Sequence, residues 1–326
     1  FQANIYTTNF QRYPSIAASG SGDFVLTWQS TGQDGSSDGI YAKKFSKHGN
    51  PLTSEIPVNT YTTNQQQTPV VAADNSGKFI IAWAGQGAAD SQGIYTQRFN
   101  ADGTTNGAVI SVNDYTSGNQ QNPAIALDSA NNFIITWDGQ GATDSPGIFA
   151  RRFDSTGSPV GGQFAVNSYT SFTQDNPSVA VDSSGGFVIA WESDSQDGGA
   201  TGIFGQRYTS TGSVTGGEFQ VNTYITNSQV NPSVAYDSNS EFMVVWQSSA
   251  QDGSGNGIFG QRYSTSGIRK NLELQVNNYT TNNQINPSVF KGENGKFFIT
   301  WESTNQDGDQ GSIITSQFDS KNRPEE

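Results

Sequence analysis

The six tryptophans of this chain fall at one phase of an internal repeat. Prolines and tyrosines recur with the same spacing of 54 or 55 residues. The three series are Trp28, Trp83, Trp137, Trp191, Trp246 and Trp301; Pro14, Pro69, Pro123, Pro177, Pro232 and Pro287; and Tyr6, Tyr61, Tyr115, Tyr169, Tyr224 and Tyr279. Periodicity over the whole length indicates one supersecondary unit copied six times, which leaves no room for a second, unrelated domain.

Each unit contains four short strand patterns separated by turn signals. In the unit that begins at Pro177 they cover residues 177–182, 187–191, 202–208 and 218–222. The second pattern is apolar on both faces, as in a strand packed between neighbouring sheets, whereas the fourth alternates with polar residues outward.

Four antiparallel strands in a repeat of this length are typical of a β-propeller blade. We therefore predict an all-β, six-bladed β-propeller of four-stranded antiparallel blades; an open β-solenoid is the alternative. No fourth strand pattern follows Phe318, and residues 1–6 align with residues 219–224, so we expect the N-terminal strand to complete the last blade. The predicted single domain spans residues 1–326, with blades at 14–59, 69–113, 123–167, 177–222, 232–277 and 287–318 plus 1–4, and a C-terminal tail at 319–326.

Composition limits the partners and the compartment. The formal net charge of −13 opposes binding to nucleic acid, and no apolar run approaches the roughly 20 residues of a membrane span. The absence of cysteine removes disulfides and thiolate chemistry. No basic, apolar leader precedes Phe1, which we interpret as the processed form of a secreted protein. We expect an extracellular or cell-surface location, with no nucleic-acid partner and no membrane insertion.

A recurrent motif supports this location. It consists of Phe242-Met-Val-Val-Trp246, Gln251-Asp-Gly253, Gly257-Ile-Phe-Gly-Gln-Arg-Tyr263 and Gln275-Val-Asn277. It resembles tandem β-propeller-type repeats found in large secreted and surface proteins of bacteria and protists. The resemblance covers the whole chain and implies an extracellular, adhesive or architectural role, with glycans, copies of itself or other surface proteins as partners. It implies no catalytic residues.

One rim of the predicted propeller is richer in polar and aromatic loops than the other. Gln-Asp-Gly loops follow the second strand in four blades, but blades two and three have loops that are one residue shorter, at 85–93 and 139–147. Shorter loops predict a notch suited to a sugar or a neighbouring subunit. The predicted ligand-binding residues are Asp34, Tyr61, Asp90, Tyr115, Asp144, Phe172 and Asp197.

Other recurrent residues favour a structural interpretation. An amide repeated in every blade is expected to build its loop, and a cationic residue on the third strand of blades one to five is expected to pair with carboxylates or carbonyls. These series are Gln11, Gln66, Gln120, Gln174, Gln229 and Gln284, and Lys44, Arg98, Arg152, Arg207 and Arg262. No cofactor is predicted; calcium at the Gln-Asp-Gly loops is a weaker alternative, because each loop offers only one or two carboxylates. Asn278 lies in an N-x-T glycosylation pattern.

Histidine chemistry is restricted to one residue, His48, in a turn on the less decorated rim. This excludes Ser-His-Asp catalysis and metal sites with several histidines. Carboxylate chemistry remains open, because Glu192 and Glu302 each follow the blade tryptophan directly and glycosidases need a pair of acids. The sequence favours a non-enzymatic module for adhesion, glycan binding or surface assembly. The alternative is a glycosidase that uses rim carboxylates.

Overall fold

The computed structural model describes residues 1–88, 90–142, 144, 146–319, 321 and 323–325. It confirms the predicted fold class: the chain is an all-β six-bladed propeller, and every blade is a four-stranded antiparallel sheet. The described residues contain no α-helix and a single 3₁₀ turn, η1 (Glu293–Gly295).

The chain forms two compact units, Phe1–Ala165 and Val166–Glu326, with three blades each. The first unit contains β1 (Gln11–Ala18), β2 (Phe24–Thr31), β3 (Asp38–Phe45) and β4 (Ile56–Pro57); β5 (Gln66–Ala73), β6 (Phe79–Gly85), β7 (Gly93–Phe99) and β8 (Ile110–Ser111); and β9 (Gln120–Leu127), β10 (Phe133–Gly139), β11 (Gly147–Phe153) and β12 (Phe164–Ala165). The second unit contains β13 (Gln174–Val181), β14 (Phe187–Asp194), β15 (Thr201–Tyr208) and β16 (Val214–Gln220); β17 (Gln229–Tyr236), β18 (Phe242–Ser249), β19 (Asn256–Tyr263) and β20 (Arg269–Gln275); and β21 (Gln284–Lys291), β22 (Phe297–Ser303), β23 (Ser312–Phe318) and β24 (Pro324–Glu325).

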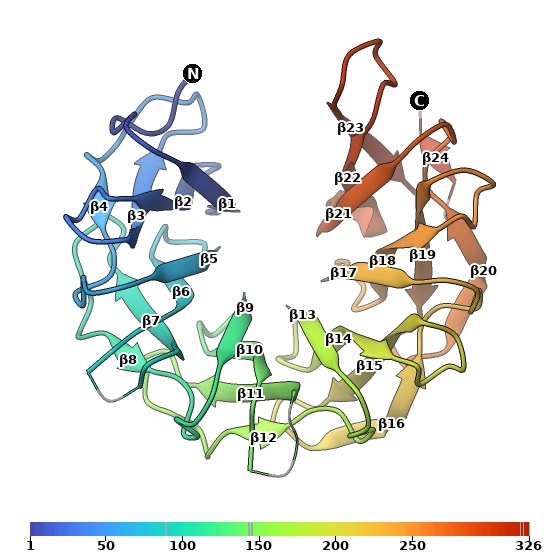
Figure 1. Ribbon diagram of the computed structural model, residues 1–326, viewed down its shortest axis with the longest axis horizontal. Helices are drawn as coiled ribbons and strands as arrows, with labels where there is room; N and C mark the ends of the chain where they lie inside the picture. Colours follow the sequence, from blue (N-terminus) through green and yellow to red (C-terminus); the bar gives the residue numbers. More distant parts are fainter. Residues whose placement is uncertain (89, 143, 145, 320, 322, 326) are drawn as a thin grey trace. The chain divides into compact units, whose positions relative to one another are not determined.

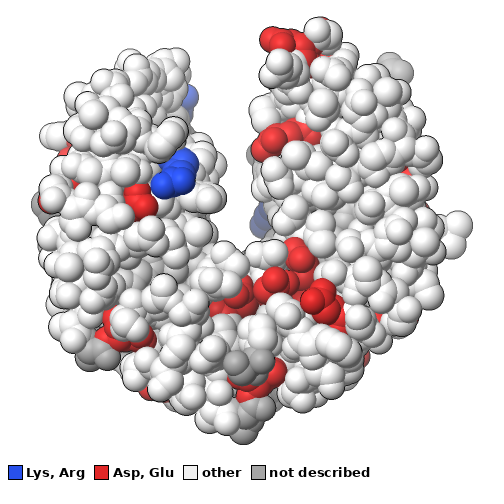
Figure 2. All heavy atoms as spheres, viewed as in Figure 1, with Lys and Arg blue, Asp and Glu red and all other residues white. Residues whose placement is uncertain are grey.

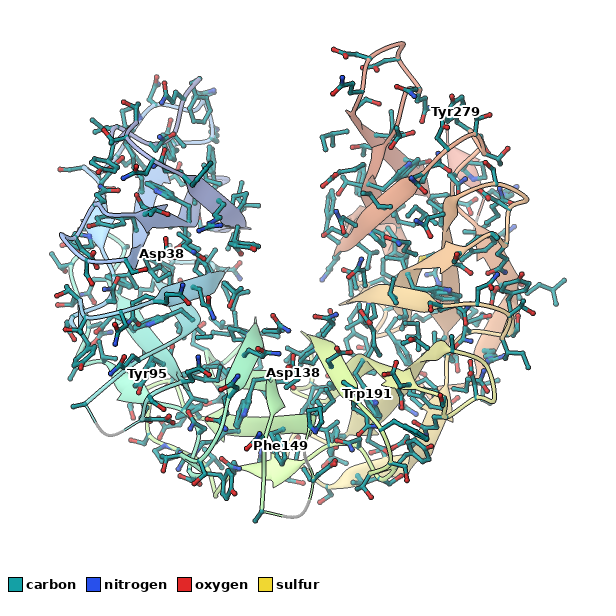
Figure 3. The ribbon with its side chains drawn as sticks, viewed as in Figure 1. Asp38, Tyr95, Asp138, Phe149, Trp191 and Tyr279 are labelled. Carbon is teal, nitrogen blue, oxygen red and sulfur yellow. The ribbon has the colours of Figure 1, made fainter. Side chains whose placement is uncertain are left out.

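Within each unit the first strands of successive blades are neighbours. β5 contacts β1 and β9, and β17 contacts β13 and β21 (Figure 1). The apolar faces of the second strands are buried between adjacent blades, and Trp191 on β14 is fully buried (Figure 3). The predicted core role of the tryptophans follows from this packing, because a large ring at the end of a buried strand stabilises both neighbouring sheets.

Every first strand carries a β-bulge that includes its proline. In blade four the register passes from Asp175↔Glu192 to Ser178↔Ala190, so the bulge consists of Asn176 and Pro177. The bulge residue has a positive φ in all six blades, at Tyr13, Thr68, Asn122, Asn176, Asn231 and Asn286. A bulge redirects the side chains on either side of it, and bulges often lie next to functional sites.

A buried asparagine joins the blades. In the second unit, Asn222 Oδ1 accepts a hydrogen bond from Ile203 N at 2.8 Å, and Asn222 Nδ2 lies within hydrogen-bond distance of Asp197 Oδ2, Tyr224 O and Gln229 Oε1. Asn113 and Asn277 make the same set of contacts in their blades. The recurrent Gln and Asp therefore serve to position the loops.

The cationic residue on the third strand reaches the next blade. Arg207 donates to the carbonyls of Thr265 and Ser266, and Lys44 donates to those of Gly77 and Ala101. Arg262 is fully buried and also pairs with Asp237 at 2.6 Å. For these residues the predicted pairing with carbonyls and carboxylates is confirmed.

Both ends of the chain bear on the prediction that the N-terminal strand completes the last blade. The Phe1 ring centroid lies 5.0 Å from that of Phe45, much as that of Phe219 lies 5.3 Å from that of Tyr263, so the Phe1 ring packs against the first blade. The sixth sheet has its own fourth strand, β24, where the sequence predicted only a tail. That part of the prediction was wrong, because two paired residues with a proline carry no alternating apolar pattern. Asp319 makes this turn by accepting hydrogen bonds from Lys321 N and Arg323 N. Completion of the sixth blade by residues 1–4 stays a prediction.

Replacing Asn222, the buried asparagine between blades four and five, tests its structural role. Asn222→Ala leaves the buried Ile203 N and Gln229 Oε1 without partners, which we expect to lower the free energy of unfolding by about 3 kcal/mol. Asn75→Ala, at an exposed turn, is the control and should change stability by less than about 0.5 kcal/mol. Urea unfolding of both variants measures the difference; equal midpoints would contradict the role.

Candidate active site

Glu192 is a buried acid at the end of a second strand. It follows Trp191 on β14, and its side chain is only 5% exposed. Glu192 Oε1 accepts two hydrogen bonds, from Asn176 Nδ2 at 2.8 Å and from Asn231 N at 2.7 Å. These donors are the bulge residues of blades four and five, so the carboxyl group lies where two bulges meet.

Burial raises the pKa of Glu192 to about 7, against the hydrogen bonds from Asn231 and Asn176, which lower it. The neighbouring Asp175 and Asp194 carboxylates raise it further. Asp175 is the direct cross-strand partner of Glu192, and its own pKa is raised by burial and then by Asp194. Asp175, Glu192 and Asp194 are called the acid cluster below.

The two oxygens of Glu192 differ. Oε1 is held by two donors, whereas Oε2 has no hydrogen bond to any residue that the structure describes. A carboxyl group held through one oxygen can carry a proton on the other. With a pKa near neutrality, this is the arrangement expected of a general acid.

An amide chain runs from the acid cluster to blade six. Asn231 Nδ2 lies 3.3 Å from Asn286 Oδ1, and Asn286 Nδ2 donates to Glu302 Oε1 at 3.1 Å. Glu302 has the same place on β22 as Glu192 has on β14, but it is exposed. The sequence singled out both glutamates for the residue type and position; burial distinguishes them.

The same position in blade one shows what the fold itself requires there. Gln29 Oε1 lies 3.4 Å from Thr68 N, which matches the contact between Glu192 and Asn231 N. An amide oxygen therefore satisfies the contact between blades. A buried acid costs free energy that glutamine does not, so the carboxyl group of Glu192 is not explained by the fold.

The aspartates predicted to bind a ligand build loops. Asp34, Asp90 and Asp197 each accept a hydrogen bond from a backbone N–H of their own turn. Each also accepts one from the Nδ2 group of the buried asparagine that joins its blade to the next. Asp90 is 4% exposed, and Asp144, at the same position in blade three, is also buried. The shortened loops include residues 89, 143 and 145, which lie outside the described residues. A ligand contact by these aspartates stays a prediction.

The other predicted residues are more accessible. Tyr61 and Tyr115 are half-buried, and their carbonyls accept hydrogen bonds from Asn59 and Asn113. Phe172 is 66% exposed. Asn278 is also exposed, as glycosylation requires, although its modification stays a prediction.

On the face seen in Figure 2, lysine and arginine side chains are scarce and acidic ones form separate groups. Among the described residues, no group of three or more His, Cys, Asp or Glu is arranged to hold a metal ion. Nor does that part of the chain include a helix with the length and apolar character needed to cross a bilayer.

Three solved structures share this fold over nearly the whole chain. A Penicillium chrysogenum alpha-L-arabinanase complexed with arabinobiose is 14% identical, with 95% of this chain and 94% of that chain covered and a TM-score of 0.62. The Fusarium graminearum GH93 alpha-L-arabinofuranosidase is 12% identical, with coverage of 94% and 92% and a TM-score of 0.61. A Dyadobacter fermentans protein of unknown function is 12% identical, with coverage of 93% and 94% and a TM-score of 0.60. No family model and no curated protein matches the chain.

These findings correct the prediction of a non-enzymatic adhesion or assembly module. At such low identity the likeness establishes the fold, and two of the three structures named above are glycosidases. The prediction was wrong because it weighed the presence of a single histidine against an enzyme. Carboxylate chemistry needs no histidine, and burial of Glu192 raises its pKa, which residue types alone do not show.

The raised pKa predicts a pH-dependent stability. The unfolded pKa of Glu192 is near 4.5 and the folded one about 7, so the stabilising contribution of the protonated form is complete below the first value and is lost as pH rises through the second. The loss is on the order of 3 kcal/mol. Glu192→Gln stays neutral, so we expect its melting temperature to exceed that of the parent at pH 8 by more than at pH 5. Thermal unfolding across this range measures the difference.

Glu302→Gln is the matched control, because it makes the same change at the equivalent but exposed position. It should keep the parent's pH dependence. A Glu192→Gln protein whose stability follows the parent at every pH would contradict the raised pKa.

Proposed function

We propose that the protein is a glycoside hydrolase that acts on arabinose-containing glycans, with Glu192 as the general acid. The buried Glu192 carboxyl group, held through one oxygen only, carries this proposal. The alpha-L-arabinanase and the alpha-L-arabinofuranosidase of the same fold support the substrate class, since both were solved with arabinobiose.

Glycosidases pair a protonated acid with an ionised carboxylate across the scissile bond. With a pKa near 7, Glu192 is protonated under mildly acidic conditions and donates its proton to the glycosidic oxygen as the bond breaks. Asp175, opposite Glu192 in the sheet, is the proposed second carboxylate. It stabilises the positive charge that develops on the sugar ring and takes the proton of the water that adds to the anomeric carbon, so that a bond to hydroxyl replaces the broken glycosidic bond. Asn176 and Asn231 hold the acid in place.

The location and partners follow from the substrate. A polysaccharide is too large to enter a cell, so the enzyme acts outside it, consistent with the predicted extracellular location. Its partner is then the glycan itself. The excess of negative charge favours neutral glycans over anionic ones.

Removal of the acid should abolish most of the activity. For Glu192→Gln we expect kcat on linear arabino-oligosaccharides and on a chromogenic alpha-L-arabinofuranoside to fall by about 10²–10⁴-fold. The parent's kcat should decline as pH rises through about 7, the pKa of the group that must stay protonated. Asp175→Asn should lower kcat at every pH.

Glu302→Gln, purified in the same way, controls for contaminating enzymes and for changes in the surface charge of the same rim. It should retain kcat within about twofold. The proposal fails if the parent hydrolyses none of these substrates, or if Glu192→Gln is as active as Glu302→Gln.

A further inference from the structure

The first unit contains a cavity of about 410 Å³ at the ends of its first and second strands. This volume lies within the roughly 300–1,000 Å³ typical of small-molecule sites. Blades one, two and three all contribute to the lining, which consists of Ser37, Asn64, Gln65, Gln67, Ala84, Gly85, Gln86, Ser91, Gln92, Asn119, Gln120 and Gln121. The lining contains no charged side chain and no aromatic ring, and none of its residues belongs to the acid cluster.

The cavity exists because blade two has small residues where other blades have long ones. Ala84 follows the tryptophan of β6, at the position of Gln29, Gln247 and the two glutamates discussed above. Gly85 comes next, and a Cβ there would collide with Gln66 Oε1. The short side chain of Ala84 thus leaves room in the cavity that a glutamine at this position would occupy, whereas the space beside Gly85 is taken by Gln66.

The walls are fixed by backbone contacts. Gln120 N donates to Gln92 O at 3.0 Å, which joins the loop of blade two to the first strand of blade three. Asp38 and Gln65 form a parallel bridge between blades one and two. A site with fixed walls loses little conformational entropy when a ligand binds.

Several amides in this cavity remain available for a ligand. Among the described residues, the side chains of Gln65, Gln67, Gln92 and Gln121 have no hydrogen-bond partner, whereas Gln120 is used within the fold. Each free amide offers two donor hydrogens and one acceptor oxygen. Hydroxyl groups match this mixture, and the absence of charge favours a neutral ligand over an ionic one.

We propose that this cavity binds a neutral oligosaccharide through its free glutamine amides, as a second carbohydrate site that takes no part in bond cleavage. The inference does not depend on the proposed hydrolase activity, since the cavity and the acid cluster share no residue. In an enzyme, such a site would hold a glycan chain close to the protein between cleavage events.

Isothermal titration calorimetry of the Glu192→Gln protein tests the proposal without hydrolysis of the probe. Arabinotriose and maltotriose are the neutral probes, and trigalacturonic acid is the anionic one. Ala84→Gln should fill the cavity and remove one neutral-trisaccharide site per chain. Ala130→Gln, the same change in an exposed turn outside the cavity, should keep the parent stoichiometry.

Gln67→Ala combined with Gln121→Ala removes two free amides without adding bulk, and should weaken the same site at least tenfold. This double variant decides the outcome if Ala84→Gln does not fold. The inference is overturned if no neutral probe binds, if trigalacturonic acid binds as well as the neutral probes, or if the cavity variants bind as Ala130→Gln does. If the parent protein has no hydrolase activity but the cavity variants still lose one binding site, the cavity is supported and only the proposed function is refuted.

Discussion

The joint between blades depends on one buried asparagine per repeat. Its side chain gives the third strand of its own blade an acceptor, and it holds a loop aspartate and the first glutamine of the next blade, as Asn222 does for Ile203, Asp197 and Gln229. A buried amide with all its groups paired specifies one geometry, because any shift leaves a polar atom without a partner. This requirement keeps the asparagine, the aspartate and the glutamine nearly constant along the chain.

Among the described residues, the cross-strand pair that precedes each bulge makes no such hydrogen bonds to the buried asparagine, and its residue types vary from blade to blade. The two residues face each other across the first and second strands, as Arg12↔Gln29, Gln67↔Ala84, Gln121↔Asp138, Asp175↔Glu192, Val230↔Gln247 and Ile285↔Glu302. One pair places two acids side by side, and another leaves a cavity bordered by amides. The bulge itself is constant, so the same backbone presents a different chemistry in each blade.

Burial then decides what each variable residue can do. Glu192 and Glu302 have the same neighbours in sequence, yet one is enclosed by the bulges of two blades and the other is exposed. A carboxyl group removed from water holds its proton to a higher pH. The proposed acid and its control thus differ in their surroundings rather than in residue type.

The sequence by itself determined the repeat, the four strands of blades one to five, the core role of the tryptophans and the structural role of the glutamines, because these depend on periodic burial and local hydrogen bonding. It also drew attention to Glu192 and to the short loops of blades two and three. Only the tertiary structure decided that Asp90 is a buried loop residue, that Asp175 faces Glu192, and that Ala84 opens a cavity. Those properties depend on strand register across a bulge and on contacts between blades, and the spacing of residues along the chain specifies neither.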